Sequence, residues 1–295
     1  MSKGARMKKT LIAGLFLAFM SPLLVGQSQK RPTPRFILCL GGGPVWPQAG
    51  ESTRYTDIWV APVSGQVRES TEIGFSAERA IAFSGSVTYF LKSTVGIQFA
   101  AGAFTSSLPN TAEMTLEPNQ ENSGWQALHS SFEGEGKISS IPLSLNIALL
   151  IPVSRLDVLI STGLTIYVNS AQASSAAWWG DYRYDPSEGV ELIDVARVEI
   201  HIPKTSWVGI GMNLGLGLSY TLVGKLGVFA DARYYLCPAT DLSWQWPAGT
   251  FSGVFGKIAD LTIDPDDAAR ATARTGSHFI NPSSFAALAG LRFVF

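Results

Sequence analysis

Few residues of this chain have the type and spacing that catalysis or metal binding requires. The three histidines, His129, His201 and His278, are scattered along the sequence, and each falls in a stretch that we expect to be a loop. A nucleophile and its base must lie within hydrogen-bond reach of each other, and the sequence spacing brings no such pair together. The two cysteines form no zinc-type pattern with these histidines. We therefore expect no catalytic residues, no metal site, no cofactor and no enzymatic activity.

Three charged residues share one face of the last two strands that we predict. Asp231, Arg233 and Arg292 all fall on the face that points into the fold, because alternate side chains of a strand point to opposite faces. Buried charges need partners. We favour a structural network of ion pairs, and the alternative is a path for protons or solutes.

Aromatic residues gather in the stretches between the predicted strands. Candidate recognition residues in two of these stretches are Trp178, Trp179, Tyr182, Tyr184, Trp244 and Trp246. Exposed aromatic clusters mark recognition surfaces. The alternative is that such long loops pack against one another, and the sequence leaves both interpretations open.

Four aspartates lie between Asp260 and Asp267. Their spacing differs from that of an EF-hand calcium loop. Because Pro265 and an alanine-rich run follow, we interpret the segment as a solvated acidic stretch or as the start of a helix.

Alternation of apolar and polar residues predicts eight strands. Their approximate ranges are 36–45, 79–91, 94–106, 137–150, 156–169, 206–222, 225–236 and 285–295. The stretches 197–203 and 253–263 are candidates for further strands. Connections at 92–93, 151–155 and 223–224 are short, those at 46–78, 107–136, 170–205 and 237–284 are long, and the two kinds alternate.

Sorting of loops by length is typical of outer-membrane β-barrels, which have short periplasmic turns and long extracellular loops. In the sixth stretch every second residue from Val208 to Leu222 is apolar, while glycine, asparagine and serine occupy the other face. The second faces of the eight stretches are rich in small and polar residues, which indicates a polar interior. We predict an all-β fold, a closed antiparallel transmembrane β-barrel of eight strands. A soluble lipocalin barrel is the alternative.

Both ends of the chain support export. Lys3, Arg6, Lys8 and Lys9 precede an apolar run of about ten residues, which is the pattern of a secretory signal peptide. We expect cleavage after Gly26, so that residues 1–26 are the signal peptide. Residues 27–295 are then the β-barrel domain with four long extracellular loops.

The C-terminal strand ends on Phe293-Val294-Phe295. An aromatic-x-aromatic end resembles the assembly signal of bacterial outer-membrane β-barrels, which assigns that role to Phe293 and Phe295. The mature chain resembles small outer-membrane barrels of the OmpA/OmpX-like or PorT-like kind. The resemblance implies a Gram-negative bacterium, an outer-membrane location, contact with outer-membrane lipid and recognition by the β-barrel assembly machinery.

Charge and the placement of the cysteines argue against nucleic-acid binding and against a disulfide bond. The formal net charge of −1 is not the basic footprint of a nucleic-acid-binding protein. Cys39 and Cys237 fall near opposite ends of the predicted strands, tens of ångströms apart and beyond disulfide reach. We expect two free thiols.

For function, we expect a non-enzymatic outer-membrane protein that binds through its aromatic loops or serves as a subunit of a larger membrane protein complex. One alternative is a channel with more than eight strands. Another is a lipid-modifying outer-membrane enzyme, because Asn281-Pro282-Ser283 before a terminal strand resembles the end of the lipid A deacylases. The His-x-Ser-Asn motif of those enzymes is absent here.

Overall fold

The computed structural model describes residues 34–48, 53–61, 65–118, 128–153, 156–185, 190–255, 260–275 and 277–295. Most of these residues lie in strands, and residues Pro265–Thr275 form the helix α2. The all-β prediction is confirmed. The expected signal peptide, residues 1–26, lies outside the described residues. Within the described part, no helix is both long and apolar enough to cross a membrane.

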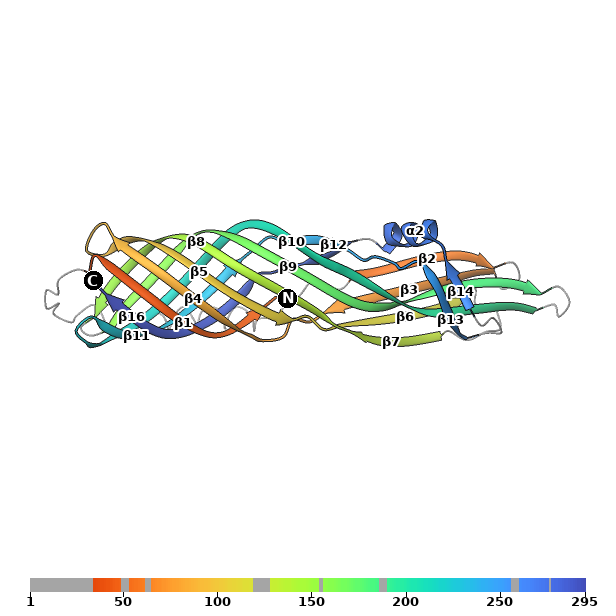
Figure 1. Cartoon of the computed structure of the whole chain (residues 1–295), viewed down its shortest axis with the longest axis horizontal. Helices are drawn as coiled ribbons and strands as arrows, with labels where there is room; N and C mark the ends of the chain where they lie inside the picture. Colours follow the sequence, from red (N-terminus) through yellow and green to blue (C-terminus); the bar gives the residue numbers. More distant parts are fainter. Residues whose placement is uncertain are drawn as a thin grey trace, which may run out of the picture.

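Eight strands pair in a ring (Figure 1). They are β1 (Phe36–Pro47), β4 (Ala80–Phe90), β5 (Val95–Ser107), β8 (Gly136–Val153), β9 (Leu156–Asp185), β10 (Val190–Val223), β11 (Leu226–Leu236) and β16 (Ser284–Val294). Each strand is antiparallel to its neighbours. The last strand, β16, pairs with both β1 and β11, and β11 pairs with β10, so the order returns to its starting point. We call this ring the barrel.

One end of the barrel carries the short connections. Gly224 and Lys225 form a two-residue turn between β10 and β11, and Gly224 has a φ of 55°, which tight hairpins require. Residues 91–94 join β4 to β5. At the same end Phe295 donates its backbone N–H to the carbonyl oxygen of Phe36 over 2.9 Å, where the first and last strands meet. Figure 1 shows the C-terminus at this turn end.

The long connections are structured at the other end, and this differs from the expectation of loops. The strand β9 has 30 residues and β10 has 34, so both run far past the stretches predicted for them. The candidate extra strand 197–203 is part of β10. Part of the candidate 253–263 belongs to β13 (Gly249–Phe255) and β14 (Asp260–Ile263), which join β10 outside the ring.

Two sheets project from this end of the barrel (Figure 1). One has the order β2 (Thr53–Ala61), β3 (Gly65–Phe75), β6 (Asn110–Pro118) and β7 (Leu128–Gly134). The other consists of the distal parts of β9 and β10 with β13 and β14. A short pair, β12 (Thr240–Ser243) and β15 (Ser277–Ile280), lies with them. We call the two sheets, this pair and α2 the extension.

The two faces of the barrel differ in polarity, in the sense that the sequence predicted. Along β10, apolar side chains from Val208 to Leu222 are exposed on the outside. The polar side chains Gln98, Asn146 and Asn213 are buried inside. A soluble lipocalin would bury the apolar face around its own interior, so this arrangement favours the membrane-type barrel over that alternative.

The helix α2 packs on one side of the extension. Asp264 accepts a hydrogen bond from the backbone N–H of Asp267 over 2.7 Å, which is an N-cap, and Pro265 occupies the first helical position. The interpretation of this acidic segment as a helix start is confirmed. A hydrogen bond and the charge of Asp267 raise the pKa of Arg270 above its ordinary value.

Candidate functional site

The interior of the barrel holds two ion pairs. Arg292 on β16 contacts Asp157 on β9 over 2.5 Å, and these strands are not neighbours in the ring, so the pair crosses the interior. Arg233 contacts Asp231 over 3.1 Å on the same strand, β11. The three charged residues predicted to face inward do so. The partner of Arg292, however, is Asp157, a residue that the sequence did not pair with it.

A chain of amide and hydroxyl groups extends from Arg233 through the interior. Gln98 accepts hydrogen bonds from Arg233 over 3.2 Å and from Asn146 over 3.0 Å. Asn213 donates to Asn146 over 2.7 Å and to Thr165 over 2.8 Å. Buried polar groups of this kind are costly unless they are paired, and here several strands supply the partners. The network fills and rigidifies the interior.

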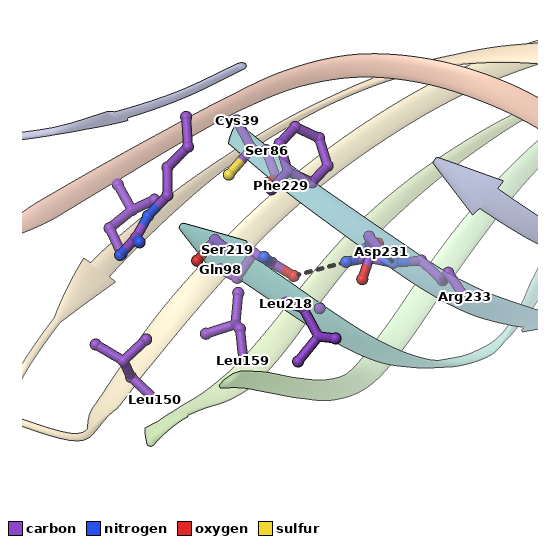
Figure 2. A pocket seen from close by; sticks show the side chains of 13 residues that line it. Cys39, Ser86, Gln98, Leu150, Leu159, Leu218, Ser219, Phe229, Asp231 and Arg233 are labelled. Atoms are coloured by element: carbon purple, nitrogen blue, oxygen red, sulfur yellow. Dashed lines mark hydrogen bonds and ion pairs between the residues drawn. The ribbon is translucent and has the colours of Figure 1, made fainter. Parts of the chain in front are cut away.

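A small cavity of about 30 Å³ lies beside this network (Figure 2). Cys39, Ser86, Asp231, Arg233 and Arg292 are among its lining residues. The Nη1 atom of Arg233 is buried and has no hydrogen-bond partner among the described groups. The volume suffices for a buried water molecule but is far below the size of an ordinary ligand pocket.

A layer of tyrosines lies nearer the extension. Tyr167 is fully buried and donates its hydroxyl to the carbonyl oxygens of Met212, over 2.9 Å, and Leu236, over 3.2 Å. Its ring meets that of Tyr235 edge-on, with centroids 6.4 Å apart. Tyr167 and Tyr235 are therefore both buried inside and do not belong to an aromatic row on the outer face.

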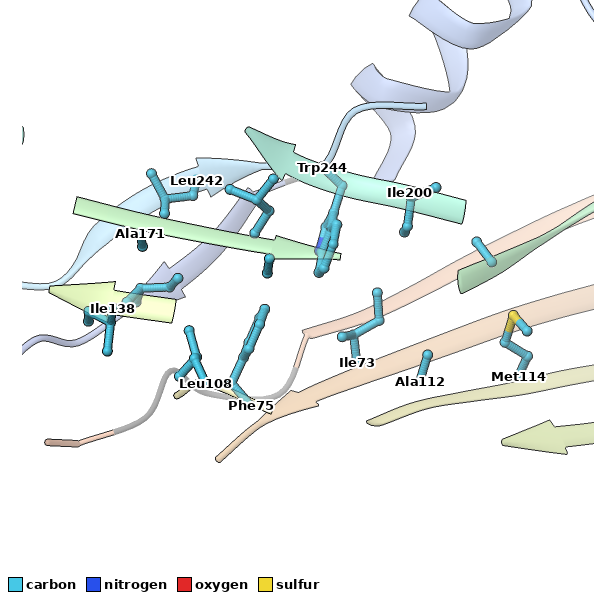
Figure 3. Packing of buried hydrophobic residues seen from close by; sticks show 14 of the residues in the cluster. Ile73, Phe75, Leu108, Ala112, Met114, Ile138, Ala171, Ile200, Leu242 and Trp244 are labelled. Carbon is cyan, nitrogen blue, oxygen red and sulfur yellow. The ribbon is translucent and has the colours of Figure 1, made fainter. Parts of the chain in front are cut away.

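An apolar core follows where the barrel meets the extension (Figure 3). Its buried members come from both sheets of the extension, from the barrel strand β8, from β12 and from connecting residues, and include Ile73, Phe75, Leu108, Met114, Ile138, Ile200, Leu242 and Trp244. The indole of Trp244 stacks on Phe75 with centroids 5.9 Å apart. This core lies where the strands of the barrel pass into the extension.

The aromatic recognition candidates divide between the core and the edge of the extension. Trp178 and Trp244 are buried and cannot present a recognition surface, which corrects that part of the expectation. Trp179 and Trp246 are partly buried and pack against each other at 6.0 Å. Trp246 also donates its indole N–H to the Thr275 hydroxyl of α2 over 2.7 Å.

The last two candidates, Tyr182 and Tyr184, lie on β9 opposite Ile193 and Glu191. Their side chains lie outside what the structure describes. The alternative interpretation, in which the long connections pack against one another, thus accounts for the tryptophans.

The residues that could support catalysis or metal binding are dispersed. His129, His201 and His278 lie on three different strands, β7, β10 and β15, and not in loops as expected. Cys39 and Cys237 are both free thiols, as predicted. The described residues contain no cluster of three or more histidine, cysteine or acidic side chains that could hold a metal ion.

Aromatic rows edge the outer face of the barrel. Near the extension, Trp46, Phe285 and Tyr234 are exposed and lie in register on the adjacent strands β1, β16 and β11. Near the turns, the exposed rings of Phe36 and Tyr89 pair with centroids 5.0 Å apart. Rings at both borders of an apolar band are typical of membrane barrels.

Comparisons with known proteins give a likeness in structure. No family model and no curated protein matches the chain. Among solved structures, the chain is similar to the outer membrane protease OmpT from Escherichia coli. The TM-score is 0.36 and the identity 11%, over 91% of this chain and 99% of that one. The similarity gives no support to the OmpA/OmpX-like or PorT-like assignment in particular.

The same similarity bears on the expected absence of enzymatic activity. We expected no enzyme, and the matched barrel is a protease, which contradicts that expectation. At this identity and TM-score the likeness does not assign protease activity to the chain either.

Proposed function

We propose that this chain is an outer-membrane protein whose barrel spans the bilayer and whose extension, held outside the cell, binds a partner. One observation carries the proposal. The outer face of the barrel is apolar, its edges carry aromatic rows, and its interior is polar and filled.

The height of the apolar face fits a bilayer. From Val208 to Tyr220, β10 covers about 40 Å at roughly 3.3 Å per residue. With the tilt of about 40° that membrane strands have, this corresponds to about 30 Å along the membrane normal, and the hydrocarbon core of a bilayer is about 30 Å thick. In the proposed orientation the short turns face the periplasm.

The ends of the chain fit the same proposal. Residues 1–26 act as the signal peptide that directs export, and residues 27–295 form the exported domain. The terminal strand β16, which completes the ring beside β1, is the segment that the β-barrel assembly machinery recognises, through Phe293 and Phe295.

The extension is the part suited to binding. The strands β9 and β10 pass from the barrel into it and remain paired to each other along nearly their whole length, which holds it firmly above the membrane. Its outer face on β10 exposes Arg197, Glu199 and His201. We therefore propose that a partner, such as another outer-membrane protein, docks on this polar face and on the outer surface of α2.

Site-specific photo-crosslinking in the bacterium that makes the protein tests this proposal. A photoreactive amino acid at Glu199 is expected to give a discrete adduct in the outer-membrane fraction, because this side chain is exposed on the extension. The same amino acid at Lys92, in a short turn, serves as the matched control. Recovery of the protein outside the outer membrane would refute the location, and adducts from Lys92 but none from the extension would refute the binding role.

A further inference from the structure

A groove of about 410 Å³ opens on the outer surface where the barrel becomes the extension. Its lining comes from the connection before β8 and from β8, β9 and β10, and includes Glu135, Lys137, Gln172 and Lys204. Lys137, Gln172 and Lys204 are exposed. The groove therefore presents two ammonium groups and an amide to whatever surrounds the barrel at this height.

Strand register places the groove relative to the apolar band. The topmost apolar side chains on these three strands form one row across the sheet, namely Ile141, Val168 and Val208. All three are exposed. One step farther toward the extension, the outward positions form a row of serines, namely Ser139, Ser170 and Ser206. The outer surface thus changes from apolar to hydroxyl within two residues.

The next row carries the positive charge. Lys137 lies directly opposite Gln172. On the other side of Gln172 the pairing of β10 slips between Ile202 and Thr205, so Pro203 and Lys204 together face one residue of β9. This is a β-bulge, a feature that re-aims side chains and tolerates proline. The three side chains therefore form one row in which the bulge brings Lys204 next to Gln172.

This row lies just above the head groups of a bilayer, within reach of a lysine side chain. Two row steps are about 13 Å along a strand, or roughly 10 Å along the membrane normal at a tilt near 40°. The polar region of each leaflet is about 5 to 8 Å thick, and a lysine side chain can bend toward it from above. The ammonium groups can therefore reach lipid phosphates, while the serine row stands at the boundary with the acyl chains.

We propose that this groove binds the phosphate group of an anionic lipid in the leaflet nearest the extension. The inference rests on the proposed membrane-spanning barrel. Two ammonium groups and one amide N–H₂ group supply donors to the phosphate oxygens. Glu135 is the opposing charge in the lining, and neither Lys137 nor Lys204 forms an ion pair with a described residue. The lining keeps a net positive charge.

Lipid binding by the purified full-length protein tests the inference. The probes are detergent micelles containing bisphosphorylated lipid A, micelles containing the same lipid without its phosphates, and inorganic phosphate alone. Native mass spectrometry measures the bound lipid. Because each lysine near a membrane surface contributes on the order of 1 kcal/mol, the protein is expected to bind the phosphorylated lipid roughly tenfold or more tightly than the phosphate-free form.

Three double variants separate the site from general charge effects. Lys137→Gln with Lys204→Gln is expected to remove the preference for phosphorylated lipid. Lys137→Arg with Lys204→Arg is expected to keep it, since the charge is kept. Lys92→Gln with Lys225→Gln removes two positive charges at the turn end and is also expected to keep it.

The possible outcomes are distinct. A glutamine variant that folds and still prefers the phosphorylated lipid would overturn the inference. If inorganic phosphate competed with the phosphorylated lipid equally well, the groove would be a site for free phosphate, and the lipid would be refuted as its ligand. A protein absent from the outer membrane would instead refute the proposed function, which fractionation of the same cells detects separately.

Discussion

At the scale of single residues, the barrel interior depends on partners that come from distant parts of the sequence. Asp157 and Arg292 are both almost completely buried and pair across the interior. Alternation along each strand is enough to place both side chains inside. Which acid meets which base depends on the order and stagger of the strands in the ring, and these follow from the tertiary fold.

Removing one member of this pair should be more harmful than removing both. Asp157→Leu leaves the Arg292 guanidinium buried beside no carboxylate of its own, which typically costs about 3–5 kcal/mol. The double variant Asp157→Leu with Arg292→Met should be clearly more stable than this single variant, because no uncompensated charge stays inside. Urea unfolding of the protein in detergent micelles measures both. Equal stability of the two variants would show that the ion pair is not the relevant interaction.

At the scale of elements, the extension is held by an apolar core between its two sheets. The distal part of β9 is rich in alanine and serine and has no alternation of large apolar residues, which is why the sequence predicted a loop there. In the structure Ala176, Ala177 and Trp178 are consecutive buried residues of this strand. The strand is stabilised here because residues on both of its faces are buried, and a neighbouring sheet provides that burial.

Trp244→Ala should loosen the extension and spare the barrel. Loss of a buried tryptophan costs about 3–5 kcal/mol, and this one stacks on Phe75 in the core that joins the two sheets. Hydrogen exchange is expected to rise in residues 190–202 of β10 and to stay slow in residues 208–220. Trp46→Ala, an exposed tryptophan on the barrel, is the control and should change neither. Faster exchange in both halves of β10 would contradict separate stabilisation.

At the scale of the whole molecule, the barrel is apolar outside and polar inside. Leu145 is 60% exposed on the outer face of β8, between the apolar row at Ile141 and the turn end. In water such a position would tolerate a charge, because exposed substitutions usually change stability by less than about 0.5 kcal/mol. In a bilayer the same position faces hydrocarbon.

Leu145→Arg therefore distinguishes the two environments. In the membrane an arginine at mid-depth costs about 2–4 kcal/mol, so a smaller amount of the variant should reach the outer membrane. A folded barrel migrates differently on a gel from the heat-unfolded chain, and the variant should change to the unfolded mobility at a lower temperature than the parent. His201→Arg, exposed on the extension, should behave like the parent. If Leu145→Arg accumulated and folded as well as the parent, the outer face would not be in contact with lipid.

The sequence by itself determined the strand pattern of the barrel, the direction in which its side chains point and the two free thiols. A period of two is a local property, so Val208 to Leu222 or Phe285 to Phe295 can be read without knowing any neighbour. The tertiary structure decided the ion-pair partners, the strands that continue into the extension, the burial of Trp178 and Trp244, and the row that joins Lys137, Gln172 and Lys204. Each of these depends on contacts between strands that are distant along the chain, and register and packing fix such contacts only when the sheets assemble.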